Sequence, residues 1–201
     1  MEKWLKKVTL EGNKVVLIPM QEEHEKDLLF AASDGNLWDL WFTSVPSKET
    51  ISSYINYAID EYDKGTCLPF TVVEKRTGEL IGSTRLFAAS PEHRRLELGY
   101  TWYGKSYQGT GINTECKYLI LNHAFEKLKC IAVEFRTHWH NTKSRNAITN
   151  LGAKQDGVLR NHQIDNSGAL RDTVVFSIIQ SEWPTVKKSL EYKISKSTLD
   201  S

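Results

Sequence analysis

The segment GYTWYGKSYQGTGINTECKYLIL, residues 99–121, decides the fold, because it joins an expected strand to an expected helix through a glycine-rich turn. Its first part, GYTWY, is rich in aromatic and β-branched residues that favour strands. Its last part repeats apolar residues at the spacing of a helix. The glycines between them permit positive φ and can leave backbone amides open to an anion.

Two phosphate-binding patterns overlap in this segment. The triphosphate pattern G-x-x-x-x-G-K-[ST] is matched by Gly99, Gly104, Lys105 and Ser106. It requires a helix to begin at the Lys-Ser pair, but Tyr-Gln-Gly-Thr-Gly follows, and two glycines in a first helical turn cost about 1 kcal/mol each relative to alanine. The second glycine turn, residues 108–111, directly precedes the periodic helix. We favour this second turn as the anion site, with a purely structural turn as the alternative.

Length and composition set the broad class of the protein. The chain has 201 residues, of which 40% are hydrophobic and 25% charged, and 26 basic against 25 acidic residues leave a net charge of +1. We expect a single domain, residues 1–201, with a core from about 12 to 185 and a C-terminal tail from 186 to 201. The balanced charge argues against a nucleic-acid partner. Three scattered cysteines, Cys67, Cys116 and Cys130, suggest reduced thiols rather than disulfides or a metal site.

No apolar run approaches the roughly 18 residues of a membrane helix, and the start, MEKWLKKVTLEGNK, lacks the apolar core of a signal peptide. We therefore expect a cytoplasmic protein with no membrane partner.

The order of elements predicts a mixed α/β layer. A strand, glycine turn, helix and strand follow one another at its centre, and a helical crossover makes the two strands, 96–103 and 130–138, parallel. The other expected strands are 15–20, 70–75, 79–87, 156–163 and 171–179, and the expected helices are 22–33, 47–65, 113–128 and 142–151.

The loop YQGTGINTE resembles the acyl-CoA pyrophosphate loop of the GNAT superfamily of N-acetyltransferases, whose pattern is Q/R-x-x-G-x-G/A. Gln108, Gly111 and Asn113 occupy the three pattern positions, and Asn113 stands where the family has Gly or Ala. Three blocks in order, LELGYTWY, HNTKSRNAITNLGAKQDGVLRNH and LRDTVVFSIIQSEWP, resemble the RimJ/RimL-type branch, which acetylates ribosomal proteins and small amines. The resemblance covers residues 12 to 185.

The resemblance implies an α+β fold with a central, mostly antiparallel sheet, flanking helices and two parallel strands that splay apart around the pantetheine arm of acetyl-CoA. It also implies that loop amides hold the pyrophosphate and that a backbone N–H in residues 99–102 holds the acyl oxygen. The cofactor-binding residues that we expect are Tyr100, Thr101, Trp102, Gln108, Gly109, Thr110, Gly111, Ile112, Asn113 and Asn141.

The chemistry of acetyl transfer requires a neutral amine and a stabilised oxyanion. An α-amine is about a tenth neutral at pH 7, whereas a lysine is neutral to only about 0.04%, so an α-amine needs only a modest base. Glu97, on the strand that leads to the splay, is the expected base; the alternative is a structural ion pair with Arg94 or Arg95. Because the matching serine of the family donates a proton to the sulfur, Ser144 is the expected acid.

Asn141 is also the expected cap of the helix that follows it. Trp38 and Trp41 are expected either to line the pocket of the amine acceptor or to pack in the core. His138 and His140 are more typical of solvated loop residues.

The sequence leaves the identity of the acceptor open between a protein N-terminus and a small amine, and the oligomeric state open between monomer and homodimer. No metal is implied. A non-catalytic acyl-CoA-binding module and, less favoured, a triphosphate-binding protein remain the alternative functions.

Overall fold

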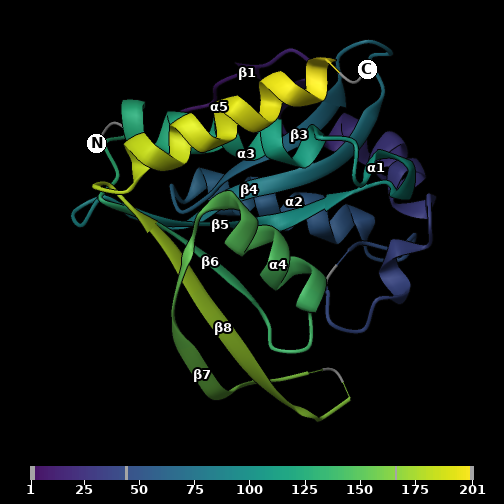
Figure 1. Cartoon of the computed structure of the whole chain (residues 1–201). Helices are drawn as coiled ribbons and strands as arrows, with labels where there is room; N and C mark the ends of the chain where they lie inside the picture. The colour runs from purple at the N-terminus through teal and green to yellow at the C-terminus, as the bar shows by residue number, and fades with distance from the viewer. Residues whose placement is uncertain (1–2, 44, 166, 200–201) are drawn as a thin grey trace.

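The computed structural model describes residues 3–43, 45–165 and 167–199, and one eight-stranded sheet runs through its centre (Figure 1). The strand order is β1-β2-β3-β4-β5-β6-β8-β7. β5 and β6 are parallel, whereas the other neighbouring pairs are antiparallel, so the expected mostly antiparallel sheet with one parallel pair is confirmed. The strands are β1 (Leu10–Glu11), β2 (Val15–Pro19), β3 (Leu68–Glu74), β4 (Leu80–Ser90), β5 (Arg95–Tyr103), β6 (Ala132–His138), β7 (Lys154–Ile164) and β8 (Leu170–Ile179).

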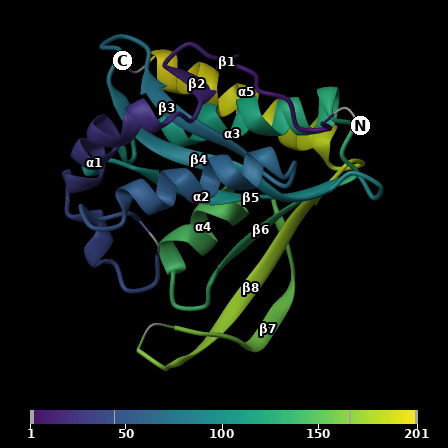
Figure 2. The ribbon, with the colours of Figure 1, turned by 180° about the vertical axis from the view of Figure 1, so that it is seen from behind.

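Helices cover both faces of the sheet. α3 and α5 lie side by side on one face, as Figure 1 shows, and α1 and α2 cover the other, which Figure 2 shows from behind. The helices are α1 (Glu25–Ser33), α2 (Ile51–Asp63), α3 (Ile112–Asn122), α4 (Thr142–Leu151) and α5 (Trp183–Leu199).

The core consists of two clusters of buried residues, one on each face of the sheet. The larger lies under α3, α4 and α5 and includes Cys116 and Ile120 of α3. The smaller lies under α1 and α2 and includes Ile55 and Trp102. All three cysteines are buried and unpaired, and burial raises the pKa of each thiol to about 12.

The C-terminal segment corrects one expectation. We predicted a tail from residue 186, but α5 buries Val186 and Leu190 in the larger cluster. Trp183 at its start stacks on the ring of Phe125, with 5.1 Å between the ring centroids. The boundary at 185 therefore falls inside a helix that belongs to the core.

The parallel pair is short. β5 and β6 pair over only three positions, from Arg95↔Ala132 to Glu97↔Glu134, whereas β6 pairs with β8 along its whole length. Beyond Glu97 the two strands diverge (Figure 1), which confirms the expected opening between them.

Among the described residues, no helix is long and apolar enough to cross a membrane.

Candidate active site

A β-bulge lies on β5 just beyond the point where pairing with β6 ends. Arg85 faces Gly99 and Ser83 faces Trp102, so Tyr100 and Thr101 together oppose a single residue of β4. Tyr100 has φ of 50°, a left-handed conformation that is strained for an aromatic residue. Because a bulge takes a residue out of the ladder of hydrogen bonds, it suits the expected donors in residues 99–102.

The glycine turn after β5 has the backbone geometry that the sequence predicts. Gly109 and Gly111 have φ of 81° and 87°, in the left-handed region. Gly111 is the N-cap of α3 and, as a glycine, has no side chain that could cap the first turn of the helix. The first N–H groups of α3 can therefore bind an anion. The side chain of Ile112 is buried, whereas Asn113 is half-buried at the surface of this turn.

Two side chains tie this loop to its surroundings. The Gln108 amide donates to the carbonyl of Tyr103 at 2.9 Å and accepts a hydrogen bond from Lys143 at 2.5 Å. Lys143 lies in the first turn of α4, so it places a positive charge beside the loop. Thr110 uses its hydroxyl locally, on the carbonyl of Tyr107 at 2.8 Å.

The rival triphosphate pattern does not form a phosphate loop. The N–H of Ser106 donates to the carboxylate of Asp34 at 2.7 Å, and the N–H of Lys105 donates to the carbonyl of Asp34 at 3.0 Å. A short 3-10 turn, Lys105–Tyr107, stands where that pattern needs a long helix. The amides are already occupied by a negatively charged residue, so the pattern is a chance match.

Glu97 is the last residue of β5 that pairs with β6. Its side chain is buried, and Oε1 lies 3.2 Å from Nε of Arg136 on β6. Burial raises the pKa of the carboxyl; Arg136 opposes the rise and Glu134 adds to it. The ion pair that we considered as the alternative exists, but with Arg136, since Arg95 instead pairs with Glu134.

The start of α4 presents the other expected polar pair. Asn141 is the N-cap, and its side chain accepts a hydrogen bond from the N–H of Ser144 at 3.0 Å, which confirms the expected cap. The Ser144 hydroxyl forms no hydrogen bond within the described part of the chain. It is therefore available to a ligand.

The two tryptophans lie in different environments. Trp38 packs against the smaller core cluster. Trp41 is 64% exposed, and its ring contacts His138 edge-on, with 4.9 Å between the centroids. His138, which we expected to be solvated, is buried; burial, followed by the charge of Arg171, lowers its pKa and favours the neutral ring. Its Nδ1 accepts the N–H of His140 at 3.0 Å.

Four charged residues around this opening were not expected from the sequence. Arg136 and Lys143 come from segments that only the register of the sheet and the placement of α4 bring close. Arg85 and Lys117 are buried on either side of the bulge. A charge within an otherwise apolar helix, as in ECKYLIL, was the available signal for Lys117.

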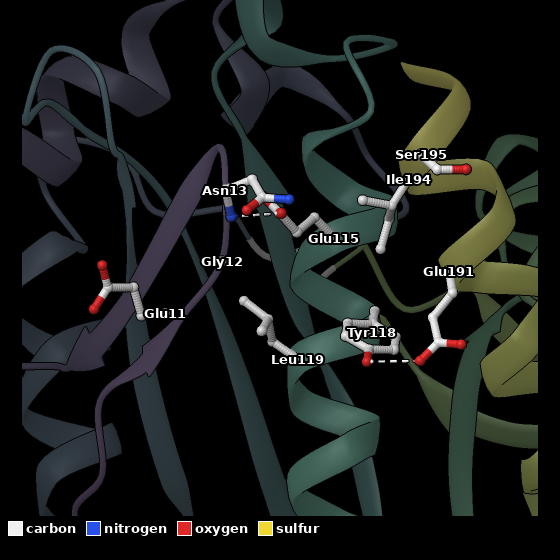
Figure 3. A pocket seen from close by; sticks show the side chains of 9 residues that line it. All are labelled: Glu11, Gly12, Asn13, Glu115, Tyr118, Leu119, Glu191, Ile194 and Ser195. Atoms are coloured by element: carbon white, nitrogen blue, oxygen red, sulfur yellow. Dashed lines mark hydrogen bonds between the residues drawn. The ribbon is translucent and has the colours of Figure 1, made fainter. Parts of the chain in front are cut away.

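A separate hollow of about 370 Å³ lies between the β1–β2 hairpin, α3 and α5 (Figure 3). The Glu115 carboxylate there accepts three backbone N–H groups of the hairpin, at 2.7 to 3.1 Å, and Tyr118 donates to Glu191 at 3.0 Å. None of the expected site residues lines this hollow, and its carboxylates are engaged in structural hydrogen bonds. We therefore assign it no part in the active site.

In the described ranges, no group of three or more His, Cys, Asp or Glu side chains is arranged to hold a metal ion.

Comparison with known sequences identifies the class of protein that this site belongs to. The acetyltransferase (GNAT) domain family matches residues 14–154. The chain belongs to this family of N-acetyltransferases.

Individual relatives agree with this assignment. The N-acetyltransferase p20 of Bacillus licheniformis, whose function is uncharacterized, is 27% identical over 142 residues, which are 71% of this chain and 77% of p20. A GCN5-related N-acetyltransferase from Brucella melitensis has 26% identity and a TM-score of 0.83, over 94% of this chain and 86% of that one. RimJ from Mycobacterium smegmatis, in complex with CoA-disulfide, has the same fold, with a TM-score of 0.78, 21% identity and coverage of 92% and 94%.

Proposed function

We propose that this enzyme moves an acetyl group from acetyl-CoA to a primary amine by direct attack, without a covalent enzyme intermediate. One observation carries the proposal: β5, which parts from β6 after Glu97 and contains the bulge, leads along a single path of chain through the glycine turn to the start of α3. Such a path suits a cofactor with an anionic pyrophosphate, an extended arm and a reactive thioester.

In this arrangement, the backbone amides of residues 109–113 bind the pyrophosphate, with Lys143 and Gln108 at the rim. The pantetheine arm occupies the opening, where Asn141 lies at the start of α4. The acyl oxygen accepts a backbone N–H from the bulge segment, Tyr100 to Trp102. The RimJ structure, which contains CoA-disulfide, supports this choice of cofactor.

The amine nitrogen attacks the carbonyl carbon, and its proton passes to Glu97, directly or through water. The tetrahedral intermediate then collapses, the C–S bond breaks, and Ser144 donates its proton to the departing thiolate while it takes up a proton from water. The raised pKa of Glu97 supports its role, because a buried carboxylate is a stronger base than an exposed one.

The acceptor is proposed to be a protein N-terminus or a small amine, because the sequence resembles the RimJ/RimL-type branch. Trp41, exposed beside His138, is the better placed of the two tryptophans to contact it. We place the enzyme in the cytoplasm, as a monomer or homodimer.

A thiol-release screen tests this function. Acetyl-CoA is offered with peptides that have free N-termini, polyamines, amino acids and aminoglycosides, and free CoA is measured. We expect release above the hydrolysis rate with at least one class of amine. Tight binding of acetyl-CoA without release for any amine would favour the alternative, a non-catalytic acyl-CoA-binding module.

A further inference from the structure

Two buried cations lie on opposite sides of the bulge of β5. Arg85 on β4 is 1% exposed and Lys117 on α3 is 6% exposed. Neither forms an ion pair with a carboxylate in the part of the chain that the structure describes. A buried charge without a counter-charge destabilises a folded protein, so two of them beside one bulge call for an explanation.

Lys117 contacts the bulge from the face that carries α3. Its Nζ lies 2.5 Å from the hydroxyl of Thr101, a bulge residue, and 3.5 Å from the hydroxyl of Thr84. The two threonine hydroxyls are 2.8 Å apart, across the irregular point of the β4–β5 pairing. The ammonium group is therefore bound only to neutral oxygens.

Arg85 contacts the bulge from the face that carries α2. Its guanidinium lies between two rings, 4.0 Å from the centroid of Tyr54 and 4.5 Å from that of Tyr100, the second bulge residue. One guanidinium nitrogen donates to the carbonyl of Tyr54 at 3.0 Å, whereas the buried Nε has no hydrogen-bond partner. Within the described ranges, its positive charge, like that of Lys117, forms no ion pair with a carboxylate.

We propose that Lys117 and Arg85 are positioning residues that make the bulge of β5 an anion-stabilising site, acting through Thr101 and Tyr100 on the backbone N–H groups between them. The inference rests on the proposed function, which places the acyl carbonyl at this bulge. The ground-state thioester is neutral, whereas the tetrahedral intermediate is an oxyanion. Two charges without counter-ions in a poorly solvated site therefore stabilise the intermediate more than the substrate.

The lysine makes this stabilisation dependent on pH. Burial lowers the pKa of Lys117 to about 7, and the neighbouring Cys116 thiol, which opposes that shift, has its own pKa raised to about 12 and stays neutral. The positive charge of Lys117 is therefore lost as the pH rises through about 7. Among the described residues, other titratable groups near α3 do not contact the Lys117 ammonium group. The Glu115 carboxylate is bound by the β1–β2 hairpin, the Glu191 carboxylate of α5 is bound by Tyr118, and Arg85 lies on the opposite face of the sheet. Burial raises the pKa of Tyr103 on β5 and keeps its hydroxyl neutral.

A pair of unreactive CoA analogues tests the inference by isothermal titration calorimetry. S-carboxymethyl-CoA carries a carboxylate near the position of the oxyanion, and S-carbamoylmethyl-CoA carries a neutral amide of the same shape. We expect the wild-type enzyme at pH 6 to prefer the carboxylate by roughly tenfold or more, and the preference to shrink by pH 8.5.

Variants assign the preference to the two cations. Lys117→Met and Arg85→Met should each lose most of the preference for the carboxylate analogue, while they bind the neutral analogue as tightly as the wild type does. Lys127→Met, which removes an exposed lysine from the turn after α3, should keep it. In turnover, Lys117→Met should lower kcat with little change in the KM for acetyl-CoA.

The outcomes separate this inference from the proposed function. The inference is overturned if the variants lose affinity for both analogues equally, or if the wild type does not prefer the charged analogue. Either result leaves the acetyltransferase assignment intact. Failure of both analogues to bind the wild type overturns the proposed function as well. If Lys117→Met does not fold, the wild type alone tests the inference through the pH dependence of its preference for the carboxylate analogue. A purely structural lysine would leave that preference unchanged between pH 6 and pH 8.5.

Discussion

The two halves of β5 differ in their pairing with neighbouring strands and in the pairing of the charges around them. In residues 95–97 the strand is paired on both sides, and its charged side chains are matched by Glu134 and Arg136 of β6. In residues 99–103 it no longer pairs with β6 and contains a bulge, flanked by two buried cations that form no ion pair with a carboxylate among the described residues. The paired half suits proton transfer, and the open half suits an acyl group and its developing negative charge.

The difference shows how one strand can separate two tasks. A carboxylate that must lose and gain protons needs a fixed partner, which pairing with β6 supplies. An oxyanion site needs donors that no strand already uses, which only an interrupted ladder supplies. Substitutions in the two halves should therefore affect different kinetic constants.

The largest expected effect is in the paired half. Glu97→Gln should lower kcat by roughly 10²- to 10⁴-fold and leave acetyl-CoA affinity close to wild type, because base catalysis acts in the transition state. Burial raises the pKa of Glu97, so the wild-type rate should fall with acid at a higher pH than an ordinary carboxyl would give. Initial rates between pH 5 and 9.5 measure both effects.

Glu134→Gln is the matched control. Glu134 belongs to the same ion-pair network. Burial acts to raise its pKa, but the hydrogen bonds and charges of Arg95 and Arg136 together lower it, so Glu134 should stay ionised and take no proton. We expect a loss of stability but an unchanged pH profile. If Glu97→Gln instead keeps the wild-type kcat and the wild-type pH profile of the rate, the ion pair of Glu97 is purely structural, and water or the substrate takes the proton.

The second prediction concerns the open half and its loop. Gly111→Val should weaken acetyl-CoA binding on the order of 100-fold, because a β-branched residue resists positive φ and blocks the approach of the pyrophosphate to charge-assisted amide donors. Calorimetric titration with acetyl-CoA measures it. Gly78→Val introduces the same strain in the β3–β4 turn, where φ is 77° and an added Cβ meets no atom within 4 Å. Equal affinity in both variants would return the turn at Gly111 to a structural role.

The third prediction concerns the leaving group. Ser144→Ala should lower kcat by only about tenfold, because a thiol with a pKa of about 8.5 departs readily even without a proton donor. Asn141→Ala should instead reduce stability, by about 1 kcal/mol, since it removes the cap of α4. Thermal unfolding and kcat, measured together on both variants, distinguish the two roles. A Ser144→Ala enzyme with a lower Tm but wild-type kcat would contradict the proposed role of Ser144 as proton donor.

Local patterns predicted much of this molecule. The turn at Gly109 and Gly111, the cap at Asn141 and the parallel pairing of β5 with β6 each depend on a few adjacent residues or on a short crossover. The partner of Glu97 could not be predicted in this way, because Arg136 reaches it only through the register of two strands. The bulge is set by how β4 pairs with β5, which alternation within one strand does not reveal.

The ends of the core were predicted less well. Residues 186–201 were expected to form a tail, but most of them belong to α5, in which Trp183, Val186 and Leu190 form a narrow buried stripe among polar residues. The burial of Lys117 could not be predicted from the sequence, because a lysine on a helix is ordinarily solvated; it depends on the contacts of its ammonium group with Thr84 of β4 and Thr101 of β5.

The smallest expected effect tests the end of the open half. Lys105→Ala should leave acetyl-CoA binding unchanged, because the backbone at Lys105 and Ser106 is held by Asp34 and the lysine side chain belongs to no anion site that we propose. Acetyl-CoA at about 100 times its Kd should stabilise the wild type and Lys105→Ala alike, by about 2.7 kcal/mol, and raise the Tm of each, since a ligand that binds only the folded state acts by mass action. MgATP at the same concentration should raise Tm in neither. A shift specific to MgATP that disappears in Lys105→Ala would mean that the phosphates displace Asp34 from these amides, and the open half of β5 would then lead into a nucleotide site rather than an acyl-CoA site.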